Sequence, residues 1–159
     1  MDQSVSIRKA EFRDIEPIKA ILFSALKEYE IAIPDNYAVS DIDSIDKGKK
    51  RVTVFALVRN DAVIGFVVLK QMSESTIELK RLYLTAVERG HRWGEYLLKF
   101  AITFATKHHY SEMRLETTSK FKEAVSLYKK HGFRELKDVE KAPGHDLAFE
   151  KRLASKPLS

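Results

Sequence analysis

The sequence has no cysteine among its 159 residues, which excludes disulfide bonds, thiolate nucleophiles and cysteine-ligated metal sites. It also lacks any apolar stretch as long as a membrane-spanning helix, and the N-terminal residues MDQSVSIRKAEF contain no hydrophobic signal core. The five histidines follow no metal-binding spacing, so we expect no metal site. Together these absences predict a cytoplasmic protein with no membrane partner.

What is present is the composition of a soluble globular protein, with 44% hydrophobic and 32% charged residues. The length suits one domain, which we place at residues 1–153, followed by a frayed tail at 154–159. The net charge is +5 and the pI is near 9.3. This mildly basic balance fits a phosphorylated ligand, nucleic acid or simply a soluble surface.

Hydrophobic periodicity predicts an α/β fold with a mixed, mostly antiparallel central sheet of about seven strands and helices on both faces. Asp14 is the expected N-cap of the first helix and Gly132 the expected C-cap of the last. A helical crossover joins the fourth and fifth strands. The expected strands are 5–10, 52–59, 62–70, 75–84, 113–117, 133–136 and 147–153. The expected helices are 14–29, 90–108 and 121–131, with a short one within 40–46.

The fourth strand, TIELKRLYL, changes phase along its length. Its apolar residues are Ile77 and Leu79 before the basic pair, but Leu82 and Leu84 after it. Because side chains of a regular strand alternate strictly between its faces, one buried face cannot continue through this switch. A β-bulge near Arg81 would restore it, whereas burial of both faces would make the pattern meaningless.

A basic, glycine-containing turn follows that strand and opens the next helix. Gly90 leaves room for a ligand to approach, and Arg89, His91 and Arg92 add donors and positive charge. Because a helix N-terminus presents free N–H groups and favours anions, the turn suits a phosphate site, although a solvated basic turn has the same composition. The chain has no G-x-x-x-x-G-K-[ST] motif, and its meander of strands is not the start of a dinucleotide fold.

The ordered set of segments resembles the GCN5-related N-acetyltransferases, the GNAT superfamily. It consists of IELKRLYL, a short loop, RGHRWG, an apolar helix, LET and AVSLYKKHGF. The resemblance runs from SIRKAEFRDIEPIKAIL to the last strand, LAFEKRL. Its most specific parts are ELKRLYL followed by R-G-x-x-x-G, and the Leu-Tyr-x-x-x-Gly-Phe pattern of residues 127–133.

The resemblance implies that acetyl-CoA binds in a split between the fourth and fifth strands. The pantetheine would pair with the backbone of the fourth strand, and the pyrophosphate would lie on the amides of the basic turn. The implied cofactor-binding residues are Leu82, Tyr83, Leu84, Arg89, Gly90, His91, Arg92, Trp93 and Gly94.

Arg92 departs from the family's usual pyrophosphate pattern, [RQ]-x-x-G-x-[GA], because it replaces the middle glycine. We expect its backbone to keep helical dihedral angles, so that its amide still points at a phosphate. Its side chain offers a second way to reach that phosphate.

The resemblance assigns Glu78 as a general base that takes the proton of the acceptor amine, directly or through water. Partial burial would raise its pKa toward a useful value. From the residues alone, Glu78 is equally an exposed strand carboxylate paired with Lys80 or Arg81.

Tyr128 lies on an apolar helical stripe, where a tyrosine ordinarily belongs to the core. In the family context L-Y-x-x-x-G-F, a tyrosine at this place protonates the departing thiolate. The backbone N–H of Leu82 is the expected oxyanion donor. Phe121 occupies a position where many members have an asparagine that contacts the coenzyme.

The sequence therefore predicts an N-acetyltransferase that moves the acetyl group of acetyl-CoA to a primary amine of a small molecule or peptide. Direct attack is expected because no cysteine is available to form an acyl-enzyme. A non-catalytic acyl-CoA-binding or regulatory domain on the same fold is the alternative, and nucleic-acid binding ranks last. A homodimer formed through the last strand is possible. Acidic residues preceding the first hairpin would suit a cationic acceptor: Asp35, Asp41, Asp43 and Asp46.

Overall fold

The computed structural model describes residues 5–154, and positions 155–159 of the predicted tail lie outside these residues. One seven-stranded sheet has the order β1-β2-β3-β4-β5-β7-β6. Its strands are β1 (Val5–Lys9), β2 (Val52–Arg59), β3 (Ala62–Gln71), β4 (Thr76–Leu84), β5 (Glu112–Thr117), β6 (Arg134–Glu135) and β7 (Leu147–Arg152). The helices are α1 (Ile15–Glu28), α2 (Ser40–Asp43), α3 (Trp93–Lys107) and α4 (Lys122–Lys130). Only β4 and β5 pair in parallel among these strands, so the predicted mixed sheet is confirmed.

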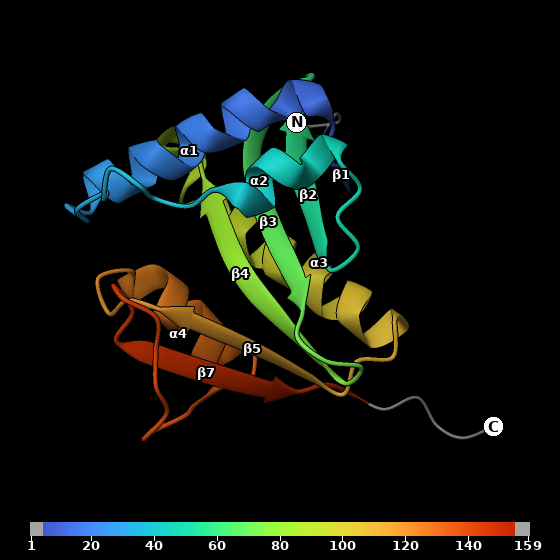
Figure 1. Ribbon diagram of the computed structural model, residues 1–159, viewed down its shortest axis with the longest axis vertical. Helices are drawn as coiled ribbons and strands as arrows, with labels where there is room; N and C mark the ends of the chain where they lie inside the picture. The colour runs from blue at the N-terminus through green and yellow to red at the C-terminus, as the bar shows by residue number, and fades with distance from the viewer. Residues whose placement is uncertain (1–4, 155–159) are drawn as a thin grey trace.

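Helices cover both faces of the sheet, as predicted (Figure 1). Ile18 and Leu22 of α1 pack with Phe66 on one face, which we call the α1/α2 face. Leu98 of α3 packs with Phe149 on the opposite face, the α3/α4 face. Each face therefore has its own apolar core, and the sheet separates them.

The two predicted helix caps have different outcomes. Asp14 is the N-cap residue of α1, as predicted, but its side chain makes no capping hydrogen bond. Its carboxylate instead accepts hydrogen bonds from the backbone N–H of Glu11 at 2.7 Å and from Arg8 at 2.6 Å, which ties β1 to the start of α1. At the end of α4, His131 is the cap residue, and Gly132 follows with a φ of 88°, which glycine adopts without strain.

The predicted bulge in β4 is confirmed. Val68 of β3 lies opposite Arg81, but the next residue of β3 lies opposite Leu79, so Lys80 is the extra residue. The inserted residue reverses the alternation. As a result Leu82 and Leu84 pack against the same α3/α4 core as Leu79.

The predicted split between β4 and β5 is also present. The two strands pair over three positions, from Thr76 opposite Glu112 to Glu78 opposite Arg114. Beyond Glu78, β4 pairs with β3, and the end of β5 pairs with β7. Figure 1 shows the two strands adjacent at one end and diverging toward the other.

Gly65 of β3 is expected to tolerate no side chain, because it lies opposite Leu84 where β4 approaches the basic turn. A Cβ atom there would lie 2.6 Å from Leu84 Cδ2 and 3.0 Å from the carbonyl oxygen of Tyr83. We predict that Gly65→Ala lowers the free energy of unfolding by about 1–3 kcal/mol, measured by urea denaturation. Gly94→Ala is the matched control, since its Cβ would meet its nearest atom at 3.7 Å. An unchanged urea midpoint in Gly65→Ala would contradict the prediction.

Candidate active site

The backbone of β4 turns its polar groups toward the split at two of the predicted residues. Thr85 donates its N–H to the carbonyl oxygen of Ile64 in β3 at 2.9 Å. Because backbone groups of an antiparallel strand point alternately to its two sides, those of Tyr83 also face β3. The N–H and C=O groups of Leu82 and Leu84 therefore face the split, where β5 has already separated from β4.

The predicted pyrophosphate loop lies between β4 and α3. α3 begins at Trp93, three residues later than predicted, so residues 89–92 form a turn. The helix has no side-chain cap, and its first backbone hydrogen bond runs from the Tyr96 N–H to the Arg92 carbonyl oxygen at 3.0 Å. The N–H groups of residues 93–95 therefore precede the first helical hydrogen bond and are oriented along the helix axis toward its open end.

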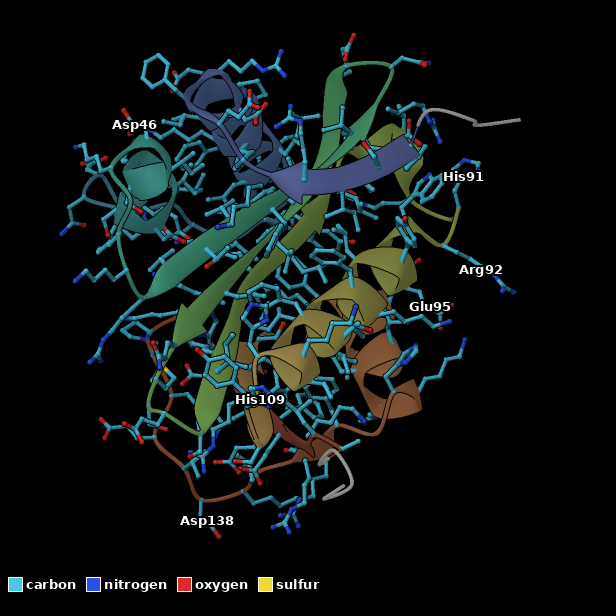
Figure 2. The ribbon with its side chains drawn as sticks, turned by 90° about the vertical axis from the view of Figure 1, so that its right-hand side faces the viewer. Asp46, His91, Arg92, Glu95, His109 and Asp138 are labelled. Carbon is cyan, nitrogen blue, oxygen red and sulfur yellow. The ribbon has the colours of Figure 1, made fainter. Side chains whose placement is uncertain are left out.

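The expected helical backbone of Arg92 is wrong. Its φ and ψ are 65° and 14°, in the left-handed region that favours glycine, and Gly90 has a φ of 83°. Both residues with positive φ in this turn, Gly90 and Arg92, therefore lie directly before the start of α3. Arg92 thus adopts a conformation that glycine adopts without strain, at a cost of about 1 kcal/mol. Its side chain is exposed, and Figure 2 shows it pointing away from the molecule.

Arg89 directs its side chain away from the loop amides. Its guanidinium is hydrogen-bonded to the Glu28 carboxylate at the end of α1. It also lies over the ring of Tyr29, 5.5 Å from the ring centroid. Of the predicted loop residues, Arg89 therefore anchors the loop to α1.

A partly buried ion pair supports the loop. Arg59 at the end of β2 donates two hydrogen bonds to the Glu88 carboxylate, at 2.7 and 2.8 Å. The same guanidinium lies 5.4 Å from the ring centroid of Trp93. These contacts join the last residue before Arg89 to the first residue of α3. No sequence pattern predicted these contacts, because Arg59 and Glu88 are 29 positions apart in the chain.

A shallow basic groove of about 400 Å³ adjoins the loop along α4. It is lined by Lys122, Glu123, Ser126, Leu127 and Lys130. Glu95 in the first turn of α3 links the two helices, accepting hydrogen bonds from Lys130 at 2.8 Å and His131 at 2.7 Å. Hydrogen bonds from Lys130 and His131 lower the pKa of Glu95 to about 2. Glu95 thus holds the groove beside the loop.

Glu78 lies at the point where the split opens. Its strand neighbours Ile77 and Leu79 face the α3/α4 core, so its side chain faces the α1/α2 side. Burial is the largest influence and raises the pKa of Glu78, although Lys70 and Lys80 oppose the shift. A carboxylate that holds its proton more firmly than usual is a stronger base, as the predicted role requires.

Tyr128 approaches the split from the opposite face. It is 5% exposed, and its ring packs against Phe133 and Phe149 with centroid distances of 5.7 and 6.2 Å. Burial raises the pKa of Tyr128, and the nearby Tyr83 raises it further. Burial also raises the pKa of Tyr83, to about 12. Both hydroxyls therefore keep their protons at neutral pH. Tyr128 can thus be part of the apolar core and still be available as a proton donor.

Arg81 fixes the bulge to α2 and to the segment that precedes it. Its guanidinium donates to the Asp41 carboxylate at 2.7 Å and to the Tyr37 hydroxyl at 2.8 Å. Both charged side chains are at least nine-tenths buried. Asp43 pairs with Lys19 of α1. Two of the four acidic residues proposed for a cationic acceptor are therefore occupied within the protein.

Comparison with known proteins identifies the family. The sequence model of the Acetyltransferase (GNAT) family matches residues 18–133. The chain belongs to the GNAT acetyltransferase family. An uncharacterized N-acetyltransferase of Schizosaccharomyces pombe is 42% identical over 57 residues, which are 36% of this chain and 35% of that protein.

Solved structures agree with this assignment. A GNAT acetyltransferase from Staphylococcus aureus Mu50 is 19% identical and superposes with a TM-score of 0.85, covering 95% of this chain and 100% of that one. The PaiA N-acetyltransferase of Thermoplasma acidophilum, solved in complex with coenzyme A, is 27% identical. Its TM-score is 0.71, with 94% of this chain and 99% of that one covered. The GNAT fold is thus shared over almost the whole described chain.

Phe121 contributes an aromatic contact where many GNAT members have an asparagine. Its ring lies edge-on to Tyr83 at 5.9 Å and to Tyr29 at 4.7 Å between centroids. It therefore connects α4 with β4 and α1, and offers no amide group to a coenzyme.

Over residues 5–154, no helix combines the length and apolar character needed to cross a membrane. Within the same stretch, no three histidine, aspartate or glutamate side chains are grouped as metal ligands would be.

The raised pKa of Glu78 predicts a pH-dependent gain of stability when its charge is removed. Burial penalises the ionised form, so this penalty is absent below the ordinary pKa of glutamate and grows as pH rises through the folded-state pKa. We expect the stability advantage of Glu78→Gln over the wild type to grow as pH rises from the ordinary pKa of glutamate until Glu78 is ionised in the folded protein, measured by urea denaturation. Glu74→Gln, in the exposed β3–β4 turn, controls for the loss of one negative charge. A difference that shrinks toward pH 8 would contradict the prediction.

Proposed function

We propose that this GNAT protein transfers the acetyl group of acetyl-CoA to a primary amine of a small molecule or peptide by direct attack. The observation that carries the proposal is that the exposed backbone of β4 continues directly into the free N–H groups at the start of α3. The backbone of Leu82 and Leu84 faces the split, and the strand then leads to the uncapped N-terminus of α3. A thioester with an extended amide chain and a diphosphate needs these two features in this order.

Glu78 and Tyr128 lie on opposite faces of the sheet, which suits the two proton transfers of the reaction. Glu78 takes one proton from the acceptor ammonium, and the neutral amine then forms the C–N bond at the thioester carbon. The Leu82 N–H stabilises the oxyanion as it develops. When the C–S bond breaks, the sulfur receives a proton from the Tyr128 hydroxyl, which regains one from the acetylated nitrogen.

The basic groove on α4 would bind the phosphate of coenzyme A that is not part of the diphosphate. Lys122 and Lys130 lie at the two ends of α4, and Lys130 contacts Glu95 in the first turn of α3. The acceptor would enter from the α1/α2 face, where Glu78 is directed. A screen of polyamines, amino acids, aminoglycosides and peptides would identify the acceptor amine.

Binding of acetyl-CoA is predicted to stabilise the protein against thermal unfolding. At one hundred times the dissociation constant, the gain is about 2.7 kcal/mol, measured by calorimetry. S-acetyl-N-acetylcysteamine is the control, because it carries the same thioester and an amide but no diphosphate. It is expected to give no shift at the same concentration. Absence of a shift with saturating acetyl-CoA would reject coenzyme binding altogether.

Turnover is predicted to depend on Glu78 and Tyr128. With the best amine of the screen, Glu78→Gln and Tyr128→Phe should each lower kcat by about 10²-fold or more, measured as thiol release, while acetyl-CoA binding is retained. Glu74→Gln and Tyr110→Phe are matched controls outside the site. Full turnover in both site variants would disprove these roles. Stabilisation by acetyl-CoA without thiol release from any amine would favour the alternative of a non-catalytic acyl-CoA-binding domain.

A further inference from the structure

Glu116 and His145 form a hydrogen-bonded pair beside Glu78 that the proposed reaction does not yet use. Met113 and Leu115 of β5 face the α3/α4 core, so Glu116 faces the α1/α2 side, as Glu78 does. Glu78 lies opposite Arg114, two residues before Glu116 on that same face. Glu116 and Glu78 are therefore diagonal neighbours at the point where the split opens.

His145 lies in a tight turn before β7, next to Glu116. His145 donates its N–H to the carbonyl oxygen of Ala142 at 3.1 Å, and Gly144 has a φ of 87°, as the third residue of a type II turn requires. One oxygen of Glu116, Oε1, holds both ends of the turn. It accepts from the Ala142 N–H at 2.8 Å and contacts His145 Nδ1 at 3.1 Å.

The contact with Glu116 fixes the tautomer of His145. A carboxylate accepts hydrogen bonds, so the nitrogen that faces it carries the proton. Nδ1 of neutral His145 is thus the donor, and Nε2 keeps a lone pair. The His145 side chain is 39% exposed, whereas Glu78 is largely buried, so the imidazole has better access to solvent.

The reaction releases one proton that has to reach solvent. An ammonium and a thioester give an amide, a thiol and one proton, and in the proposed function that proton is left on Glu78. Glu116 and His145 both lie close enough to Glu78 to influence its pKa, in opposite directions. Lys70 on β3 and Lys80 on β4 also face Glu78, and Asp146 follows His145 in its own loop.

We propose that His145 is the proton exit of the acceptor side and that Glu116 is the residue that positions it. The O–H bond of protonated Glu78 breaks as an N–H bond forms at His145 Nε2. The resulting imidazolium keeps its Nδ1–H bonded to Glu116, and then loses the Nε2 proton to a buffer base. Glu78 is thereby returned to its carboxylate form for the next acceptor. This inference rests on the proposed function.

The test compares thiol release in dilute buffer with and without added imidazole. His145→Gln is expected to lower kcat about tenfold, because a glutamine amide can bond Glu116 but cannot carry a proton. Imidazole should restore most of that loss and leave the wild-type rate unchanged. The matched control is His109→Asn. His109 lies in the turn that precedes β5, so this variant should keep the wild-type rate and show no response to imidazole. Full activity of His145→Gln in dilute buffer, or a loss that imidazole does not repair, would overturn the proposal.

A second measurement needs no turnover. Nitrogen NMR of the histidines should show His145 as the Nδ1–H tautomer in the wild type and as a mixture in Glu116→Gln. An Nε2–H tautomer in the wild type would overturn the proton exit even if the enzyme were fully active. Conversely, if the wild type released no thiol with any amine, the proposed function itself would be disproved, and the proton exit with it. That outcome would be evident before any variant is compared.

Discussion

One extra residue in a strand, Lys80, is the constraint on which the rest of the site depends. Without it, Leu82 and Leu84 would leave the α3/α4 core, and Tyr83 would lose its stacking with Phe66 on the other face. The bulge keeps both cores filled while it changes the direction of the strand. β4 can then separate from β5 after three paired positions. The split is thus a consequence of side-chain alternation in a single strand.

Two arginines at the ends of this kinked segment join it to the first helical layer. Arg81 at the bulge binds Asp41 and Tyr37, and Arg89 beyond the strand binds Glu28. The acceptor side and the proposed coenzyme loop are therefore connected through the same segment, residues 28–41. The Arg81 pair is deeply buried, so loss of either partner would leave an uncompensated charge. The geometry of the split is held by charge as well as by packing.

The fold was largely predictable because its signals are local. Alternation located the strands, helical spacing located α1, α3 and α4, and the phase change in TIELKRLYL located the bulge. Contacts between distant segments were not predictable, since nothing in the sequence pairs Arg59 with Glu88 or Glu116 with His145. Asp14 is the N-cap residue as predicted, but its carboxylate does not cap the helix, because it is bonded instead to Arg8 and to the Glu11 N–H.

Arg92 shows how a local rule can miss the reason for a residue. The comparison with the GNAT pattern identified a missing glycine, and the natural inference was an ordinary helical backbone. In the structure, Arg92 is instead left-handed, a conformation that glycine adopts more readily than arginine. An arginine accepts that strain of about 1 kcal/mol and adds an exposed charge beside the helix N-terminus. The direction of the loop amides is set by the backbone, and the Arg92 side chain points away from them.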